Sequence, residues 1–257
     1  MISAEQPYRL DDWSGELDPR ASAELFGRLA EIFGTDRGTV LDVGTGSGYL
    51  ASTLAGHGVP MVAVDIVDWR APDLDLPFAL ADACALPVRA DACAGVHMAR
   101  MLQHIDDWTG ALAEMVRVLR PGAPLALSLG GWFADGPLRD VEQTVRDEAV
   151  RRGARLADAP ADIDGPPDVD AELAALGMSA PEVVEVAGVL VRTPRQVVAD
   201  VVGRTDRWAP GQDLSVLYQV GGSVLESLSN GPLGLDADEA LAQQQLVSYR
   251  VYRAATR

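Results

Sequence analysis

Lysine is absent from this chain of 257 residues: all 21 of its basic residues are arginine, against 38 aspartates and glutamates. Without lysine, the protein has no Schiff-base chemistry and no lysine general base. The formal net charge of -17 also repels phosphate backbones, so we expect no nucleic-acid partner. A small-molecule substrate is the better match to this composition.

Long apolar runs and paired cysteines are also missing. No stretch reaches the about 18 apolar residues that indicate a membrane span. Residues 1–17 show no charged start followed by an apolar run, so no signal peptide is expected. Cys84 and Cys93 are too few for a zinc knuckle or a disulfide framework. We expect a cytoplasmic protein, without membrane contact, in which both cysteines are small buried side chains.

Glycine, in contrast, is concentrated after a short apolar run. Residues 40–43 predict a buried strand, and the G-x-G-x-G loop of residues 44–48 allows a tight turn into a helix. A second β-branched run, residues 59–65, ends in Asp65. This order of strand, glycine loop, helix, strand and acid is typical of a nucleoside-containing cofactor site. Because Tyr49 stands where a dinucleotide loop needs its third glycine, the spacing favours a nucleoside without a pyrophosphate over a nicotinamide cofactor.

The glycine loop resembles motif I of the class I S-adenosylmethionine-dependent methyltransferases. Four further features follow in that family's order: the acid Asp65, A-D-A-C-A-L-P over residues 81–87, M-L-Q-H-I over residues 101–105 and R-V-L-R-P-G-A over residues 117–123. Together they cover about half of the chain, and S-Y-R-V-Y-R at residues 248–253 is similar to the family's last strand. One departure is Ala94, where the family usually has an aspartate that supports the cofactor pocket.

The resemblance implies a binding site for S-adenosylmethionine and its product S-adenosylhomocysteine. The glycine loop would hold the methionine end, and Asp65 would accept hydrogen bonds from both ribose hydroxyls. Asp82 would accept from the adenine amino group while the Ala83 N–H reaches a ring nitrogen; the alternative for Asp82 is a turn cap. The implied cofactor-binding set is Asp42, Gly44, Thr45, Gly46, Gly48, Asp65, Ile66, Asp82, Ala83 and Ala99.

Catalytic residues are less well indicated, because methyl transfer from a sulfonium can proceed by alignment and exclusion of water. If a base is needed, His104 is the candidate, since imidazole titrates near neutrality and this position borders the substrate side in the family. The alternative is a structural histidine that bonds a neighbouring loop. His97 is expected to be a satisfied core residue. No metal site is predicted, because the acidic segment 154–170 fails the calcium-loop pattern at both ends.

Aromatic residues make up only 5% of the chain, so their positions are informative. Several fall on segments that should face the cleft at the carboxyl ends of the strands. Each alone is more often a packing residue, but as a set they indicate a hydrophobic or aromatic acceptor. The predicted substrate-binding residues are Trp13, Tyr49, Trp132 and Phe133.

Helices and strands alternate along the first half of the chain. The predicted helices are residues 21–33, 49–55, 109–119 and 137–152 and one starting near residue 193, and the predicted strands are residues 40–43, 59–65, 78–81, 94–99, 125–129, 183–191 and 246–253. This rhythm predicts an α/β fold with a doubly wound, mostly parallel sheet, and the resemblance implies seven strands. We expect a single domain over residues 1–257 with a partly helical cap or lid inserted at residues 135–180.

The predicted activity is S-adenosylmethionine-dependent methyl transfer to a small-molecule acceptor in bacterial secondary metabolism. The alternative is a protein of the same fold that binds the adenosyl cofactor without methyl transfer, as a pericyclase-like catalyst or a binding protein. The sequence leaves open the acceptor, the atom methylated and the oligomeric state.

Overall fold

The computed structural model describes residues 18–129, 136–155, 169–203 and 213–255. The predicted substrate-binding residues Trp13, Trp132 and Phe133 therefore lie outside the described residues. The chain divides into two compact units, each described by itself below. The first unit comprises Met1–Gly131, Ile163–Val186 and Val247–Arg257, and the second comprises Trp132–Asp162 and Ala187–Leu246.

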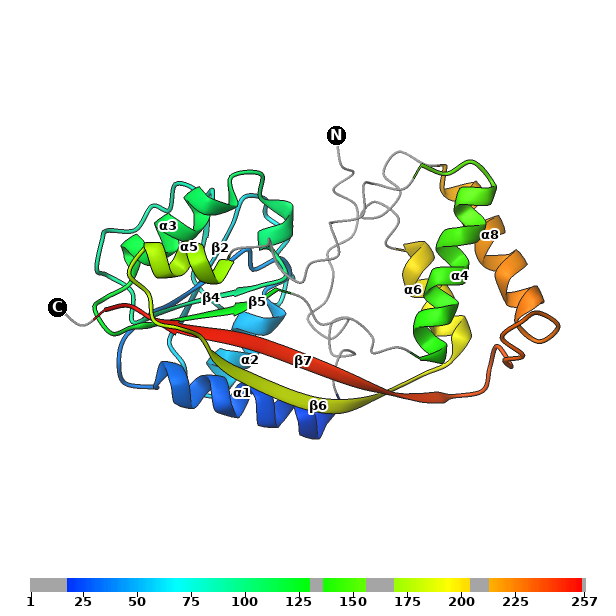
Figure 1. The fold of residues 1–257 in the computed structure, drawn as a ribbon, viewed down its shortest axis with the longest axis horizontal. Helices are drawn as coiled ribbons and strands as arrows, with labels where there is room; N and C mark the ends of the chain where they lie inside the picture. The colour runs from blue at the N-terminus through cyan, green and yellow to red at the C-terminus, as the bar shows by residue number, and fades with distance from the viewer. Residues whose placement is uncertain (1–17, 130–135, 156–168, 204–212, 256–257) are drawn as a thin grey trace. The chain divides into compact units, whose positions relative to one another are not determined.

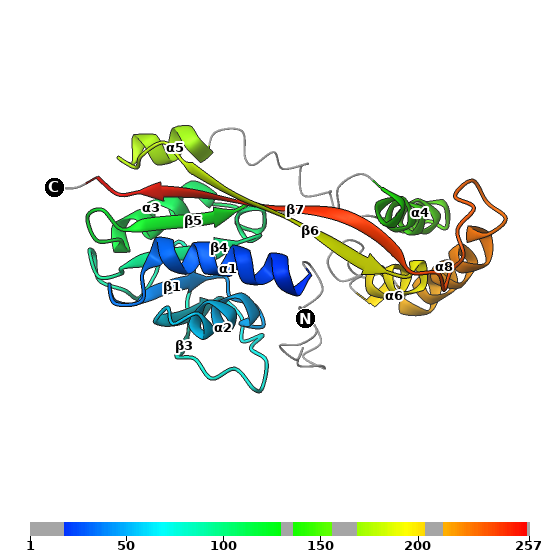
Figure 2. The same cartoon turned by 90° about the horizontal axis from the view of Figure 1, so that it is seen from below.

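A seven-stranded sheet in the order β3-β2-β1-β4-β5-β7-β6 confirms the predicted fold class (Figure 2). The first five strands pair in parallel, and β7 runs antiparallel to β5. The strand order reverses between β1 and β4, which places a ligand site of this fold class outside the carboxyl ends of these strands. The strands are β1 Val40–Val43, β2 Met61–Asp65, β3 Phe78–Leu80, β4 Gly95–Ala99, β5 Pro124–Ser128, β6 Glu182–Arg192 and β7 Leu241–Arg253.

Helix α1 shows how local sequence sets an element of the first unit. It runs over Pro19–Phe33, starting two residues earlier than predicted. The Asp18 carboxylate caps it by accepting hydrogen bonds from the N–H groups of Arg20 and Ala21, each at 3.0 Å. Proline in the first turn costs no hydrogen bond, because the first N–H groups of a helix have no partner within it.

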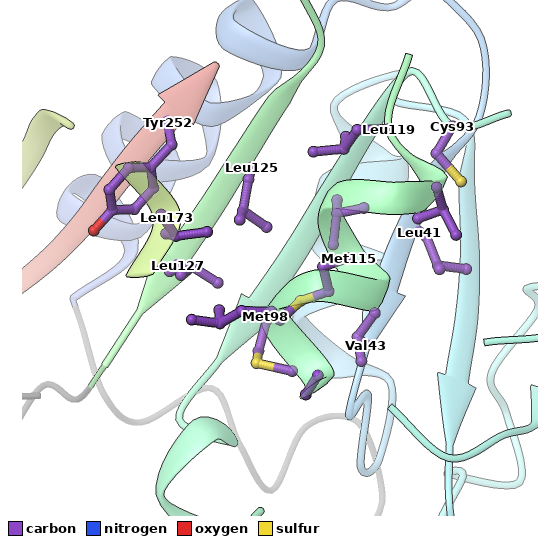
Figure 3. Close-up of a cluster of buried hydrophobic side chains, with 14 of the residues drawn as sticks. Leu41, Val43, Cys93, Met98, Met115, Leu119, Leu125, Leu127, Leu173 and Tyr252 are labelled. Atoms are coloured by element: carbon purple, nitrogen blue, oxygen red, sulfur yellow. The ribbon is translucent and has the colours of Figure 1, made fainter. Parts of the chain in front are cut away.

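The helices of the first unit cover both faces of the sheet. Helices α1 and α2 (Tyr49–Gly56) lie on one face, and α3 (Trp108–Val118) and α5 (Val169–Ala175) lie on the other (Figure 1). Alternate residues of each strand supply the two faces, as the period of a strand requires. Figure 3 shows the cluster under α3 and α5, in which Leu125, Leu127 and Tyr252 meet Met115 and Leu173.

Among the described residues of the second unit, three helices pack on one another: α4 (Pro137–Arg151), α6 (Pro194–Gly203) and α8 (Leu214–Leu228). Apolar positions at helical spacing form its core, and the neighbouring end of β6 adds Leu190. Both β6 and β7 continue from one unit into the other, side by side in both views (Figures 1 and 2). None of the described helices is long and apolar enough to cross a bilayer.

The structure corrects three expectations about these elements. Helix α8 was not predicted, and neither was α5, which begins at Val169 inside the acidic segment 154–170. Strand β7 begins at Leu241, five residues before the predicted start. The prediction missed these residues because consecutive glutamines are not typical of a strand, although they are buried in alternation in the structure. The predicted insertion at 135–180 stays a prediction: α4 belongs to the second unit and α5 to the first.

Candidate functional site

The glycine loop between β1 and α2 turns back over the end of β2. Gly44, Gly46 and Gly48 have φ angles of +74°, +56° and +87°, which other residues adopt only with strain. The N–H groups of Gly44 and Thr45 both donate to the carbonyl of Val64, at 2.9 and 3.1 Å. The loop therefore depends on left-handed backbone at alternate positions, which explains the spacing of its glycines.

The three glycines differ in what lies beside them. A Cβ at Gly44 would overlap the Met101 side chain, and a Cβ at Gly48 would come within 2.5 Å of Leu74 Cδ2. A Cβ at Gly46 would meet no atom within 4 Å. Gly44 and Gly48 are thus required by the packing of the protein itself, whereas Gly46 exposes bare backbone to open space.

Asp65, at the carboxyl end of β2, holds this open part of the loop. Its Oδ2 accepts from the Gly46 N–H at 2.8 Å, and its Oδ1 accepts from the Val67 N–H at 3.1 Å. The residue is 6% exposed. A carboxylate offers about four acceptor sites, so two remain for further donors such as a pair of ribose hydroxyls. The structure thereby brings together two parts of the predicted site that lie 19 residues apart.

The predicted adenine segment follows β3. Asp82 is exposed, and its Oδ1 accepts from the Cys84 N–H at 2.9 Å, which is the turn-capping contact considered as its alternative. The Ala81 N–H donates to the Asp65 carbonyl at 2.8 Å. The start of this segment is therefore attached to the residue that holds the glycine loop.

An ion pair on α3 fixes the far end of the same segment. Arg117 donates to both carboxylate oxygens of Glu114 and to the carbonyls of Leu86 and Val88, at 3.1 and 2.8 Å. Glu114 in turn accepts from the Leu86 N–H at 2.9 Å, and the hydrogen bond from Arg117 lowers the pKa of Glu114. Sequence reasoning noted Arg117 only as part of a motif and missed Glu114, three residues before it.

Asp42 lies in a different environment from the rest of the predicted cofactor set. Its carboxylate Oδ1 lies 2.5 Å from His97 Nδ1, its register partner on β4, and His97 Nε2 lies 3.0 Å from the Tyr249 hydroxyl on β7. Asp42 is 3% exposed and His97 0%, and burial raises the pKa of Tyr249. The prediction that His97 is a satisfied core residue is confirmed. The Asp42 side chain is held in this buried network. Its proposed part in cofactor binding is therefore indirect: it holds β1, the strand that leads into the glycine loop, in place.

The remaining predicted residues lie on segments that leave the carboxyl ends of the strands. Tyr49 is the first residue of α2, Ile66 follows β2 and is 66% exposed, Ala83 follows Asp82, and Ala99 ends β4. His104 is the last residue of the 3-10 helix η2 (Leu102–His104), where its side chain is exposed.

Two residues after β4 were missed. Arg100 has a φ of +56°, rare for a residue with a side chain, and its N–H donates to the Ser128 carbonyl at 2.7 Å. Met101 follows and packs against Gly44. Their place immediately after a strand end was one signal in the sequence, and Met101 is also the first residue of the M-L-Q-H-I motif. The expectation for Cys84 was also wrong: only Cys93 is buried, and Cys84 is partly exposed beside the Asp107 carbonyl.

The residues of this region fit an adenosyl amino acid. Thr45 Oγ1 is buried without a hydrogen-bond partner, in the loop whose Gly46 faces open space. An unsatisfied buried hydroxyl is costly unless a ligand or water supplies its partner. Together with the acceptor sites left on Asp65, the loop can hold both polar ends of such a ligand.

A family model described as a methyltransferase domain matches residues 16–156, more than half of the chain. The chain belongs to this methyltransferase family. The glycine loop and the four features that follow it resemble those of the class I members of this family. Class I members use S-adenosylmethionine as methyl donor. S-adenosylmethionine is therefore both the cofactor of this family and the one that the glycine loop predicts.

Curated relatives match this chain over part of their length. The demethylmenaquinone methyltransferase of Renibacterium salmoninarum is 34% identical over 109 residues, 40% of this chain and 45% of that protein. The O-methyltransferase resE of Aspergillus sclerotiorum is 29% identical over 121 residues, 42% of this chain and 45% of that protein. The chain thus matches less than half the length of these relatives.

Solved structures show the same fold at low identity. A protein of Anaeromyxobacter dehalogenans whose name proposes a type II methyltransferase is 20% identical, with a TM-score of 0.60 over 95% of this chain and 99% of that one. The [4+2]-cyclase SpnF is 16% identical, with a TM-score of 0.52 over 95% of this chain and 87% of that one. These similarities establish the fold of the chain and not its reaction.

Gly46→Ala tests the open side of the loop. We expect the φ of +56° to cost about 1–2 kcal/mol of stability, and the new methyl group to weaken S-adenosylhomocysteine binding by roughly tenfold or more. Gly234→Ala is the matched control, because Gly234 has a φ of +60° and also no atom within 4 Å of its Cβ position. Calorimetry should show unchanged affinity in the control; equal affinity in both variants would mean that no ligand approaches Gly46.

Proposed function

We propose that this chain binds S-adenosylmethionine at the glycine loop and transfers its methyl group to a small-molecule acceptor, leaving S-adenosylhomocysteine. The observation that carries the proposal is the hydrogen bond between Asp65 and Gly46, which ties the ribose acid to the open face of the loop. The unpartnered Thr45 Oγ1 in the same loop supports it. Family membership and the strand order agree with it.

Each part of the adenosyl ligand has a proposed partner. Thr45 and the backbone at Gly46 receive the methionine end, assisted by the N-terminus of α2, where Gly48 provides no side-chain cap. Asp65 receives the ribose hydroxyls with the two acceptor sites that Gly46 and Val67 leave.

Adenine recognition falls to the segment after β3. Asp82 and Ala83 receive the adenine ring there, on the segment that Glu114 and Arg117 hold in place. Three further members of the proposed set lie at or next to strand ends: Asp42 near the end of β1, Ile66 directly after β2 and Ala99 at the end of β4.

When bound, S-adenosylmethionine supplies a methyl group already activated on a sulfonium. The chain then has to align the acceptor atom with the methyl–sulfur axis and exclude water. His104 is the proposed base for an acceptor that must lose a proton, because it lies on the exposed segment that follows β4. Tyr49, Trp13, Trp132 and Phe133 are the proposed acceptor-binding residues.

The proposed acceptor is an aromatic or otherwise hydrophobic small molecule of bacterial secondary metabolism. Support comes from the names of the relatives, which include a demethylmenaquinone methyltransferase and an O-methyltransferase. The formal net charge of -17 speaks against nucleic acid. We place the reaction in the cytoplasm, a reducing compartment that suits the two free cysteines.

The test combines binding with product mass. Calorimetry of the full chain should show binding of S-adenosylmethionine and S-adenosylhomocysteine but not of NADH. Incubation with S-adenosylmethionine and a panel of 1-naphthol, 1,4-dihydroxynaphthalene and catechol should then yield a product heavier by one CH2 unit. Adenosyl binding with no mass gain on the panel or on a small-molecule bacterial extract would favour the alternative, a binding protein or pericyclase-like catalyst. Absence of adenosyl binding would overturn the proposal.

A further inference from the structure

Three buried polar side chains form a chain of hydrogen bonds inside the sheet. Asp42, His97 and Tyr249 all belong to the first unit. An ionised carboxylate only accepts, so His97 Nδ1 donates to Asp42, and Nε2 of the neutral ring then accepts from the Tyr249 hydroxyl. The ring of Tyr249 also stacks on that of His97, with the centroids 5.5 Å apart. In the proposed function none of these side chains contacts the cofactor directly.

The hydrogen bond between Asp42 and His97 lies where the pairing of β1 with β4 ends. The two strands pair in parallel from Val40 opposite Gly95 to Asp42 opposite His97. The strand order of the sheet reverses between these strands, and the ligand crevice of an open α/β sheet lies outside their carboxyl ends. The last pair of this ladder is therefore the point from which the proposed site opens.

Beyond this pair the two strands are held by different neighbours. Pairing of β1 with β2 continues to Val43, and the first two N–H groups of the glycine loop donate to the Val64 carbonyl. Pairing of β4 with β5 continues to Ala99. The hydrogen bond between Asp42 and His97 therefore joins the strand that leads into the glycine loop to the strand that leads into the segment of the proposed base.

Tyr249 extends the network to β7. Strand β5 lies between β4 and β7, and its residue opposite His97 is Ala126. Ala126 pairs with Val251 on β7, and the Tyr249 side chain, two residues earlier, reaches over this small residue to the imidazole. Burial raises the pKa of the Tyr249 hydroxyl, which favours the protonated form that donates to His97. The imidazole is thus held from both sides.

Stability alone does not explain a polar network at this place. The cost of desolvating buried polar groups offsets much of their attraction, and apolar side chains of similar volume often stabilise a core as well or better. A hydrogen bond, in contrast, constrains the distance and direction between the two strands that it joins. Methyl transfer requires such alignment, because a displacement of about 1 Å can cost about a hundredfold in rate.

We propose that Asp42, His97 and Tyr249 are positioning residues, which hold the glycine loop at the correct distance from the segment that follows β4. The inference rests on the proposed function and deepens it. The network acts through the backbone of β1 and β4, without touching the ligand. Cofactor affinity therefore depends on a fully buried histidine, separately from the effect of that histidine on folding.

The test compares variants that keep or remove the link between β1 and β4. Asparagine carries its amide nitrogen on Cγ, as histidine carries Nδ1, so His97→Asn can still donate to Asp42. The double variant Asp42→Leu with His97→Leu fills the same space without polar groups. Val251→Ala is the control, because it leaves a cavity in the same buried cluster without removing a side-chain hydrogen bond. Calorimetry measures S-adenosylhomocysteine affinity, and urea denaturation measures the stability of each full-length variant.

We expect the double variant to fold and to bind S-adenosylhomocysteine about tenfold more weakly than wild type. His97→Asn should bind it within about threefold of wild type, because the link to Asp42 is restored. Val251→Ala should unfold at a lower urea concentration than wild type and keep the wild-type affinity.

Wild-type affinity in the double variant would show that the network only stabilises the fold, and would overturn the proposal. So would a double variant that does not fold, a His97→Asn variant that binds as weakly as the double variant, or an equal loss of affinity in Val251→Ala. All of these outcomes leave binding by wild type intact. Absence of binding by wild type itself would overturn the proposed function, and this inference with it.

Discussion

Asp65→Ala is expected to weaken S-adenosylhomocysteine binding by about 1.5–3 kcal/mol, tenfold or more, when measured by calorimetry. The variant has no carboxylate at this position, so both ribose hydroxyls would lose their hydrogen-bond acceptor. It would also release the Gly46 N–H, which Asp65 holds at 2.8 Å. Two parts of the site fail together in this variant, so the effect should exceed that of any other single change to the cofactor residues.

The matched control for this variant is Asp68→Ala, three residues further along the same segment. It removes the same charge, but Asp68 is an exposed side chain paired with Arg70. Its affinity for the adenosyl ligand should equal that of wild type. Equal losses in the two variants would show that overall charge, and not the ribose contact, accounts for binding, and the proposed site would then be wrong.

The largest effect on stability is expected from His97→Ala, which should lower the free energy of unfolding by about 3–5 kcal/mol. The imidazole is fully buried between Asp42 and Tyr249 and packs edge-on against Phe33, with the ring centroids 6.4 Å apart. Its removal leaves the Asp42 carboxylate without its partner in a strand that is buried along its whole length. Urea denaturation monitored by circular dichroism measures the change.

Two further variants define the origin of that loss. Replacing both residues of the pair, as Asp42→Leu with His97→Leu, should destabilise less than His97→Ala alone, because no unpartnered buried carboxylate remains. The Tyr249 hydroxyl loses its partner in both variants, so its contribution cancels from the comparison. Tyr249→Phe removes only the hydroxyl and should cost about 1 kcal/mol. A double variant that is less stable than the single one would instead assign the stability to packing of the imidazole ring.

Local sequence is sufficient to predict the glycine loop and the acid that follows it. The φ angles at Gly44, Gly46 and Gly48 require glycine whatever surrounds them, so the spacing of the loop is visible in the chain itself. Asp65 could be placed by the same reasoning, because a short strand ending in an acid is a contiguous pattern. Helix α1 is similar, since its Asp18 cap and first-turn proline lie next to the residues they affect.

Tertiary structure alone decided which polar side chains find partners. Asp42, His97 and Tyr249 are up to 207 residues apart in the sequence, and their contact exists only because β1, β4 and β7 enter one sheet. The buried start of β7 was missed for the same reason: consecutive glutamines have no apolar pattern, and Gln243 Oε1 accepts its hydrogen bond from the Leu138 N–H, which lies 105 residues before it. Hydrogen bonds across such distances leave no periodic signal in the sequence, because their partners are brought together by the packing of whole elements. The family, the fold class and the glycine loop could therefore be predicted from the sequence, whereas the buried network of Asp42, His97 and Tyr249 exists only in the assembled sheet, because its members come from three separate strands.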